Sequence, residues 1–487
     1  MKPDGSLSDG RLAGLLFLGA FLVRVVTYLG TAIFGTDSGQ FLFMVDRMSE
    51  GRFHEALSVT YHPLFPLLTA IGTPLLGNAE RAGFWISMVL GSAAAIPLFL
   101  TVRTIFGQPA GFITVLIYAF LPYSVEGHAD VMSEGTFVFF FFSTAWLVWR
   151  VMEEPGLDRA ALAGMAAVAA YLTRPEGILA MVLAVGWPLL ETLRRRERLA
   201  LRLGGVAVTL LVMLIVAMPF LLWVKSFKGH WAISGKWSVE QAGRAFEVAG
   251  ATGAGSPGGL NRYVDFARSM LRLQYFVGVP LYFVGLLGLR GLRWRGGLYY
   301  FSFPCGYLAG LLWGLKTHPW MSHRYLLPAM QMLAVLAALG LILVIRLMAR
   351  RWPGRRWQYA AVGLMALVSV GASTRVYGTH RTDAVALREA AEWIRRQDSS
   401  VGPVATTQDQ VAYLSGGTTL WFPPTWEDFL SLLGNRPPEY VVYTSKDLGR
   451  KPPYVDRLKE CDRLEPAVTF PNPSRKGVWT VYVHRVR

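Results

Sequence analysis

The chain has 487 residues, of which 53% are hydrophobic and 16% are charged, and its mean hydropathy is +0.36. These values exclude an ordinary soluble protein and indicate an integral membrane protein, because apolar stretches of spanning length recur. The net charge of +16 would suit a nucleic-acid partner, but the arginines cluster in short connections, which is typical of cytoplasmic loops.

In chain order, the apolar pattern predicts a polytopic all-α membrane protein with about eleven transmembrane helices. Residues 61–77 are also apolar but contain Pro63, Pro66 and Pro74, so we expect a broken, interfacial or re-entrant segment there. The eleven predicted spans lie near residues 12–35, 80–103, 109–124, 135–150, 159–172, 178–192, 203–224, 271–289, 297–315, 324–346 and 358–377.

The positive-inside rule fixes the expected orientation of these helices. Arginine-rich connections at 194–202, 290–295 and 346–356 fall on one side, with Lys2 and Arg11. The loops that carry acidic or histidine motifs then all fall on the other side. We therefore predict one active site on the extracytoplasmic face of a bacterial inner membrane.

Three outer regions are large enough to carry structure. Residues 36–79 form the first outer loop, where Phe41, Val45 and Met48 have the spacing of an interfacial amphipathic helix. Residues 225–270 form a second, glycine-rich outer loop. The more polar residues 380–487 predict a small soluble α/β domain outside the membrane, with a helix over 387–396 and strands over 401–406, 440–443 and 478–483. Residues 1–379 would then form the transmembrane catalytic domain.

Asp37 follows the first predicted helix and is the first candidate catalytic residue. An outward-facing carboxylate at the membrane surface could accept a proton from an attacking hydroxyl, as a general base does. Alternatively, Asp37 could cap the N-terminus of the following helix, a position where Asp is strongly preferred.

Four ionisable groups occupy nine positions between two apolar segments: Glu126, His128, Asp130 and Glu134. Such a cluster can shift pKa values or hold a metal, and it suggests function. For any single member, a solvated loop residue is the simpler interpretation. The spacing does not match a standard zinc pattern.

Cationic groups accompany the remaining outer turns. Arg174 and Glu176 lie between two short helices, and His318, His323 and Arg324 precede the tenth helix. Arginine binds phosphate through a bidentate fork, although a structural ion pair or contact with lipid head groups would also account for these residues. Arg24, in the middle of the first helix, requires a partner or a water-filled path. Together, these features suggest catalysis on a lipid phosphate at the outer leaflet.

Five short motifs resemble those of the GT-C superfamily, which includes protein O-mannosyltransferases, lipid A aminoarabinose transferases and glycosylphosphatidylinositol mannosyltransferases. The resemblance covers roughly residues 12–377. It is carried by Arg24 followed by TDSGQF at 36–41, HPLFPLL at 62–68, MSEGTF at 132–137, TRPEG at 173–177 and HRYLLP at 323–328. The chain departs from the family pattern at Ser38, where a second carboxylate is common, and at Phe41, where tyrosine is common.

The resemblance implies an inverting glycosyltransferase that moves a sugar from a polyprenyl-phosphate donor to an acceptor lipid, glycan or protein. It implies Asp37 as the base, with Glu134 or Asp130 at the second acidic position. Arg324, Arg174, His323 and His318 would bind the donor phosphate, and Glu126, His128, Glu176 and His62 are candidates for binding substrate. No cofactor is expected, and assistance by a divalent metal stays open. A transporter or flippase of lipid-linked anions, and an oligosaccharide ligase with a pyrophosphate donor, are the alternatives.

Overall fold

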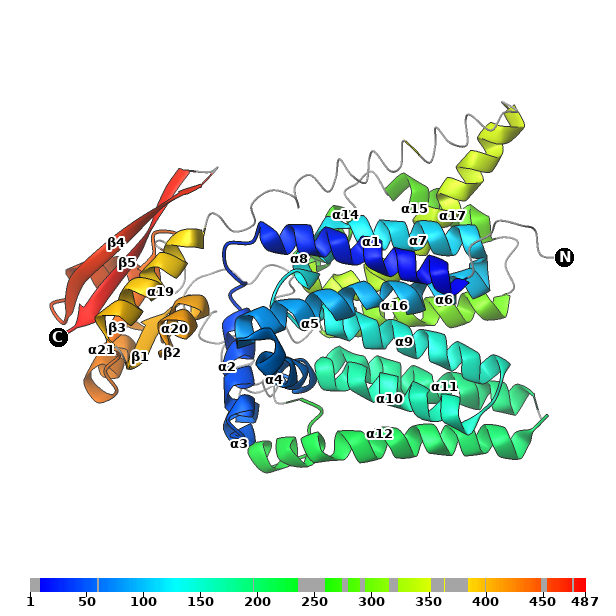
Figure 1. Ribbon diagram of the computed structural model, residues 1–487, viewed down its shortest axis with the longest axis horizontal. Coiled ribbons are helices and arrows are strands. Elements are labelled where there is room, and N and C mark those ends of the chain that lie inside the picture. The colour runs from blue at the N-terminus through cyan, green and yellow to red at the C-terminus, as the bar shows by residue number, and fades with distance from the viewer. Residues whose placement is uncertain are drawn as a thin grey trace.

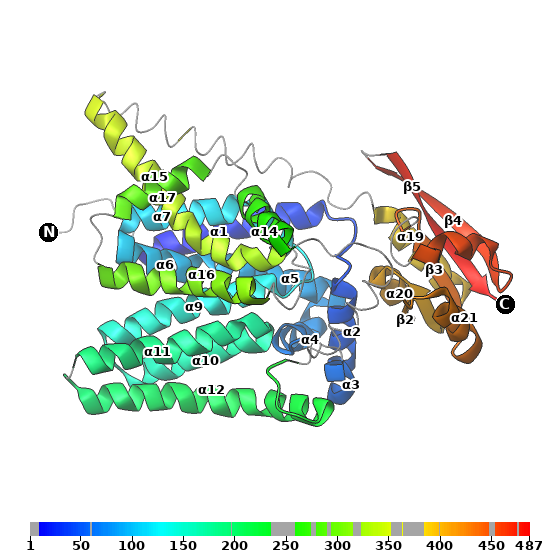
Figure 2. The same cartoon turned by 180° about the vertical axis from the view of Figure 1, so that it is seen from behind.

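The computed structural model describes residues 9–58, 61–195, 197–234, 259–273, 279–289, 294–314, 323–351, 363, 384–398, 400–447, 453–474 and 477–487. A bundle of long helices forms the body of the molecule, and a smaller α/β unit lies beyond one end of it (Figure 1). The first described helix, α1 (Asp9–Leu29), begins at the opposite end of the bundle (Figure 1, and Figure 2 from behind). This arrangement agrees with a helical membrane body followed by a C-terminal α/β unit.

The described helices of the body follow the predicted apolar segments closely. They are α1 (Asp9–Leu29), α2 (Ser38–Ser49), α3 (Phe53–Ser58), α4 (Leu64–Leu76), α5 (Ala79–Ala93), α6 (Ala95–Phe106), α7 (Gln108–Phe120), α8 (Pro122–His128), α9 (Glu134–Glu153), α10 (Leu157–Thr173), the 3-10 turn η1 (Pro175–Gly177), α11 (Ile178–Arg194), α12 (Leu199–Lys228), α14 (Gly259–Leu273), α15 (Val279–Gly288), α16 (Trp294–Gly314), η3 (His323–Leu326) and α17 (Leu327–Arg351).

Two prolines explain where the helices break. Pro97 has no backbone N–H to donate to Ala93, and the helix is interrupted at Ala94, between α5 and α6. Pro122 disfavours helical backbone at Leu121, which is extended, and α7 and α8 meet there at 62°. The second break turns the chain toward the end of the bundle and places α8 there instead of the predicted loop.

Among the described residues, six helices are long and apolar enough to cross a membrane, or seven if α7 and α8 count as one broken span. The predicted number of eleven is therefore not confirmed. The helices α10 and α15 contain 17 and 10 residues, which is short for an independent span. The predicted span at 358–377 lies outside the described residues, apart from position 363.

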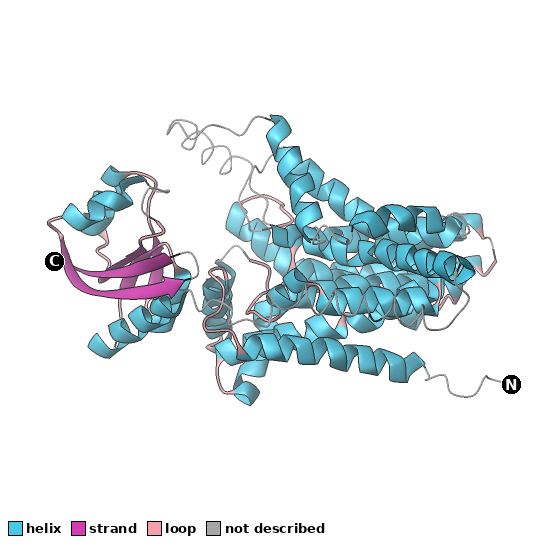
Figure 3. Cartoon of the chain, turned by 90° about the horizontal axis from the view of Figure 1, so that it is seen from above, coloured by secondary structure: helices cyan, strands magenta, loops and turns pink. Residues whose placement is uncertain are grey.

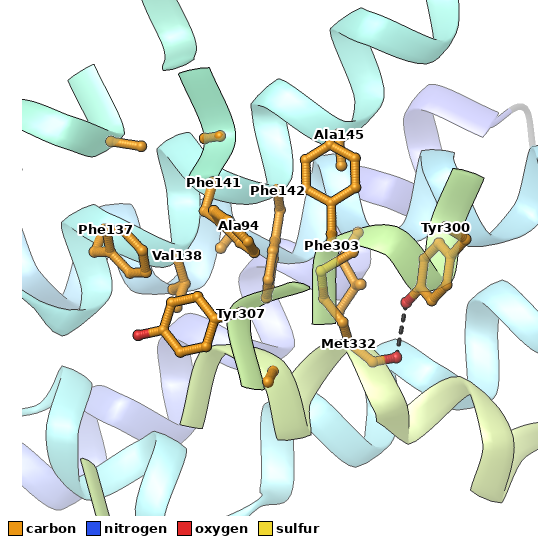
Figure 4. Packing of buried hydrophobic residues seen from close by; sticks show 14 of the residues in the cluster. Ala94, Phe137, Val138, Phe141, Phe142, Ala145, Tyr300, Phe303, Tyr307 and Met332 are labelled. Atoms are coloured by element: carbon orange, nitrogen blue, oxygen red, sulfur yellow. Dashed lines mark hydrogen bonds between the residues drawn. The ribbon is translucent and has the colours of Figure 1, made fainter. Parts of the chain in front are cut away.

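The core of the bundle is aromatic. Phe137, Phe141 and Phe142 of α9 pack against Phe303 and Tyr307 of α16 (Figure 4). Nearby, the Tyr300 hydroxyl donates a hydrogen bond to the carbonyl of Met332, at 2.8 Å. A buried tyrosine hydroxyl needs such a partner, and in a bundle without water the free backbone carbonyls are few.

Helices α15 and α17 touch backbone to backbone. A Cβ atom on Gly285 would lie 1.9 Å from the carbonyl oxygen of Leu336, and one on Gly340 would lie 2.1 Å from that of Leu281. Only glycine fits at both positions. Small residues commonly allow such close crossings between membrane helices.

The two ends of the bundle are built differently. At the end where α1 begins, Glu153 and Glu191 pair with Arg295 at 2.8 and 3.1 Å. At the other end, α2 lies across the long helices (Figure 1). Its apolar face, which includes Phe41, Val45 and Met48, is buried. The amphipathic helix predicted in the first outer loop is therefore present and covers the end of the bundle.

The C-terminal unit contains a five-stranded sheet with strand order β2-β1-β3-β5-β4. The strand β1 is parallel to β2 and β3, and β5 is antiparallel to β3 and β4. The unit lies at one end of the helical bundle (Figure 3), where its helix α20 contacts α2. Its elements are α19 (Val385–Gln397), β1 (Pro403–Thr406), α20 (Asp409–Ser415), β2 (Thr418–Trp421), α21 (Trp426–Asn435), β3 (Tyr440–Thr444), η5 (Pro453–Glu460), β4 (Leu464–Ser474) and β5 (Gly477–Val486).

Helices cover both faces of this sheet. Val404 and Val442 face α19 and α20, whereas Ala405, Val441 and Tyr443 face α21 and η5. Because both faces are covered, every residue of the central strand β3 is buried. The predicted helix over 387–396 and strands over 401–406, 440–443 and 478–483 correspond to α19, β1, β3 and β5.

Candidate active site

A pocket with an empty volume of about 450 Å³ opens at the end of the bundle that α2 covers. Five of the residues singled out in the sequence line it, although they are spread over almost 290 positions. These are Asp37, His62, Glu134, Arg174 and Arg324; the other lining residues are Phe41, Tyr61, Met132, Ser133, Thr173, Pro175 and Tyr325.

Charges of opposite sign alternate along the pocket. Arg324 Nη2 donates a hydrogen bond to Asp37 Oδ2, and Arg324 Nη1 lies 3.9 Å from Glu134 Oε1. Arg174 Nη1 approaches the same Glu134 oxygen at 3.1 Å, while Arg174 Nη2 lies 3.4 Å from Glu176 Oε1. The order Asp37, Arg324, Glu134, Arg174, Glu176 thus places two guanidinium groups among three carboxylates.

Each of these side chains stands at the end of an element. Asp37 occupies the N-cap position of α2, but its side chain makes no capping hydrogen bond and instead contacts Arg324. The capping role considered for Asp37 is therefore not the one in the structure. Glu134 begins α9. Arg174 ends α10 with extended backbone, the conformation that the following Pro175 favours.

Glu134 and Arg174 form a buried ion pair. The side chains of Glu134 and Arg174 are 3% and 12% exposed. Glu134 Oε2 has no hydrogen-bond partner among the described residues. A buried carboxylate oxygen without a partner is unfavourable, so a substrate hydroxyl that donated to it would be stabilised.

Replacing Arg174 with Gln is expected to lower the free energy of unfolding by about 3 kcal/mol, because it leaves Glu134 buried with only the distant Arg324 as a counter-charge. The double variant Glu134→Gln/Arg174→Gln should regain much of the loss. Unfolding in detergent by added SDS measures both. Arg268→Gln, which breaks an exposed pair with Asp265, is the control and should behave as the wild type. A single variant as stable as this control would contradict the prediction.

His62 is held in one orientation. Its Nδ1–H donates to the carbonyl of Tyr171 at 2.7 Å, so Nε2 is the acceptor, and it lies 3.4 Å from the Ser234 hydroxyl. The imidazole is buried and contacts the rings of Tyr171 and Phe220. His62 thus ties the start of α4 to α10 and α12 at the pocket wall.

Asp130, a candidate catalytic residue from the sequence, does not line the pocket. Its Oδ1 accepts hydrogen bonds from Gly35 N at 3.0 Å, Val131 N at 2.8 Å and Ser38 Oγ at 3.3 Å. Asp130 therefore holds the turn that carries Asp37. Because Ser38 is buried against this carboxylate, a second acidic residue at position 38 would meet a like charge, which accounts for the serine there.

His128 also lies outside the pocket and is the partner that Arg24 requires. The Arg24 guanidinium is buried and donates to the Ala20 carbonyl at 2.8 Å, and its Nη2 lies 3.0 Å from His128 Nδ1. Its Nη2 also lies 3.4 Å from Ser124 Oγ, which accepts from Gln331 at 2.9 Å. This network joins α1, α8 and α17 behind the pocket. Arg24 and His128 therefore have a structural role.

The remaining candidates are less closely tied to the pocket. Glu126 lies on α8, near His128, and does not line the pocket. Glu176 reaches it only through its pair with Arg174. His323 begins η3, but its side chain lies outside the described residues, and so does the whole of His318.

Sequence reasoning missed the aromatic wall of the pocket. Phe41 and Tyr61 have ring centroids 4.6 Å apart, and the Arg174 guanidinium lies over the Tyr325 ring at 5.0 Å. Aromatic residues are frequent throughout the chain, so composition does not single these out. Only the polar residues next to them in the sequence, which are Gln40, His62 and Arg324, could have indicated that they line a site. Aromatic faces suit the C–H faces of a sugar as well as an arginine.

The described part of the chain contains no group of three His, Cys, Asp or Glu residues placed to hold a metal. The pocket carboxylates are instead opposed by arginines. Assistance by a divalent metal therefore stays open, as in the sequence analysis.

Comparisons with known proteins agree with this geometry. A family model described as dolichyl-phosphate-mannose-protein mannosyltransferase matches residues 60–223. That segment contains His62, Glu134 and Arg174. No curated protein sequence matches the chain.

Solved structures share the fold over nearly the whole chain. ArnT from Cupriavidus metallidurans bound to undecaprenyl phosphate is similar, with a TM-score of 0.63 and 14% identity over 96% of this chain and 98% of that one. The oligosaccharyltransferase AglB from Archaeoglobus fulgidus, in complex with an inhibitory peptide and a dolichol-phosphate, gives a TM-score of 0.53 and 12% identity over 96% and 74% of the two chains. The arabinofuranosyltransferase AftD from Mycobacteria gives 0.52 and 15% over 99% and 40%. The GT-C fold indicated by the sequence motifs is thus confirmed.

Proposed function

We propose that the protein is an inverting membrane glycosyltransferase, which moves a sugar from a polyprenyl-phosphate donor to an acceptor lipid, glycan or protein. The observation that carries this proposal is the pocket, where a half-exposed carboxylate and two guanidinium groups meet at one end of an apolar bundle. The undecaprenyl phosphate bound to ArnT and the dolichol-phosphate bound to AglB give the donor class further support.

The two arginines are suited to the donor phosphate. Guanidinium groups bind phosphate oxygens through parallel, charge-assisted hydrogen bonds. Of the two, Arg324 is 40% exposed, whereas Arg174 is largely buried and already paired on both sides. Arg324 therefore makes the first contact, and the incoming phosphate competes with Asp37 for it.

Asp37 acts as the general base once Arg324 has turned to the phosphate. It takes the proton from the acceptor hydroxyl or amine, whose oxygen or nitrogen attacks the anomeric carbon on the face opposite the leaving group. The bond between the anomeric carbon and the phosphate oxygen breaks, and polyprenyl phosphate leaves with the electron pair. The unpartnered Glu134 Oε2 accepts a hydrogen bond from a substrate hydroxyl during this step.

The orientation is part of the proposal. The positive-inside rule places the arginine-rich turns in the cytoplasm, and the pocket lies at the end of the bundle that α2 covers. We therefore place the pocket and the C-terminal unit on the periplasmic side of the bacterial inner membrane.

Native mass spectrometry of the detergent-purified protein tests the donor class. We expect a polyprenyl phosphate to bind, and sealed right-side-out vesicles to transfer its sugar to an added acceptor extract. Failure to bind any polyprenyl phosphate would overturn the proposal.

The same vesicles distinguish the alternatives. Movement of the lipid across the vesicle without loss of sugar would favour a transporter, and transfer of a whole glycan from a pyrophosphate carrier would favour a ligase. Activity confined to inside-out vesicles would reverse the orientation.

A further inference from the structure

The turn that carries Asp37 lies between the membrane body and the C-terminal unit, and the residues that begin it are buried there. On its N-terminal side, Ile33 is 1% exposed and belongs to the core formed by α19 and the sheet. The next residue, Phe34, is fully buried in the cluster that covers α2, where Tyr413 of α20 packs against its ring at 6.0 Å. The two cores therefore interlock at adjacent residues.

Hydrogen bonds from the C-terminal unit hold the backbone of the same turn. Gln410 Nε2 donates to the carbonyl of Phe34 at 3.1 Å and lies 3.5 Å from Thr36 Oγ1. Arg388 Nε donates to the carbonyl of Ala32 at 3.1 Å, and its Nη2 pairs with Glu80 at 2.6 Å. Carbonyls of a loop have no partner of their own, so these bonds fix where the turn lies.

The C-terminal side of the turn meets Asp409, the first residue of α20. Gln40 Nε2 donates to Asp409 Oδ2 at 2.9 Å. At Gly39, a Cβ atom would lie 2.8 Å from Asp409 Cβ and 3.1 Å from its backbone carbonyl. The two segments thus touch directly, two and three residues after Asp37. Asp130 supports the opposite side of the turn through Gly35 and Ser38.

Stability does not explain a carboxylate at position 409. Asp409 is 2% exposed, and burial raises its pKa to about 6, with hydrogen bonds from Gln40 and Thr419 acting against the shift and the charge of Asp37 adding to it. Because the pKa of Asp409 is higher in the folded than in the unfolded protein, its protonated form stabilises the fold, and this contribution is lost as the pH rises through about 6. At pH 7 to 8 the ionised group therefore opposes folding.

We propose that Asp409 and Gln410 are positioning residues, through which the C-terminal unit holds Asp37 in its catalytic place. The inference rests on the proposed function, since Asp37 is the base of that reaction. Neither side chain lines the pocket, and both act through the backbone and Gln40. A displacement of about 1 Å at a reacting group can lower a rate by roughly 100-fold, so the expected signature is a loss of kcat.

The experiment compares Asp409→Leu, Asp409→Asn and the control Asp398→Asn in the full chain. Asp398 contacts Tyr440 and Arg485, within the C-terminal unit and away from the first turn. Asp409→Leu removes the acceptor for Gln40, and we expect kcat to fall at least 10-fold while KM for the donor changes less than 3-fold. Asp409→Asn keeps an acceptor oxygen and should stay within 3-fold of wild type. Both Asp409 variants should melt no lower than wild type at pH 8.

Hydrogen exchange of the peptide 32–42 provides a readout that needs no substrate. We expect exchange at least 10-fold faster in Asp409→Leu than in wild type and in Asp398→Asn. Gly39→Ala, which acts from the membrane side, should show the same loss of kcat. Unchanged exchange and kcat in Asp409→Leu, or a parallel loss of donor binding, would overturn the positioning role. A wild-type protein that transfers no sugar would overturn the function instead, while exchange would still decide whether Asp409 holds the turn.

Discussion

Replacing Asp37 with Asn is expected to lower kcat by about 10³-fold while the protein still folds and binds its donor. General bases contribute 10²- to 10⁴-fold to a rate, and Asn cannot accept the acceptor's proton. Asp37 is half-exposed, so the change leaves no unpaired buried charge in the core. Because Asn competes less strongly for Arg324, the affinity for polyprenyl phosphate should equal or exceed that of the wild type.

The contrast between rate and binding makes this prediction specific. Single-turnover transfer with a radiolabelled donor gives the rate, and native mass spectrometry gives the affinity. Asp265→Asn serves as the matched control, because that carboxylate on α14 is exposed and pairs with the nearby Arg268. Turnover near the wild-type rate in Asp37→Asn would remove Asp37 from the role of base.

Replacing Arg324 with Ala is expected to weaken the binding of polyprenyl phosphate by roughly 30-fold or more. A charge-assisted hydrogen bond contributes about 1.5–3 kcal/mol, and 1.4 kcal/mol corresponds to a factor of ten in affinity. Arg324→Lys keeps the charge but loses the two-pronged geometry, so it should fall between Ala and the wild type.

Arg346→Ala is the control for Arg324→Ala, because Arg346 lies near the C-terminal end of α17, the helix that follows η3, and so far from the pocket. Titration of the lipid followed by native mass spectrometry measures all three affinities. The stability of Arg324→Ala should change little, since its side chain is 40% exposed, which separates it from the buried Arg174. Wild-type affinity in Arg324→Ala would assign the phosphate to Arg174, His318 or His323.

The sequence predicted the residues that line the pocket better than the residues that hold those side chains in place. Asp37, His62, Glu134, Arg174 and Arg324 could be grouped because their loops are predicted to lie on one side of a membrane, and a membrane orders loops into two sets. Asp130 and His128 share that side as well. A charged residue can face a pocket or a neighbouring loop, and which of the two it does depends on contacts between distant segments. The periodicity of the sequence does not report such contacts, so the supporting roles of Asp130 and His128 appear only in the structure.

The C-terminal unit shows the same limit. The strands β1 and β3 are short and mostly buried, and in β5 buried residues such as Val481 and Val483 alternate with more exposed ones, so their patterns revealed them. The strand β4 contains Pro466, Pro471 and Pro473, which argue against a strand, but it lies at the edge of the sheet, where proline is tolerated. The short, largely exposed β2 and the seven-residue α20 carried too few apolar residues to predict. The contact between Gln40 and Asp409 joins residues 369 positions apart.

That separation has a consequence for biosynthesis. Arg388 is the first of the C-terminal residues bonded to the turn, and it follows Ala32 by 356 positions. At a ribosome speed of about 5–20 residues per second, roughly 20–70 s pass between the synthesis of the two. The turn with the proposed base is therefore synthesised well before the C-terminal unit that holds it in place. A nascent chain already inserted in the lipid would remain inactive until that unit had folded against the turn.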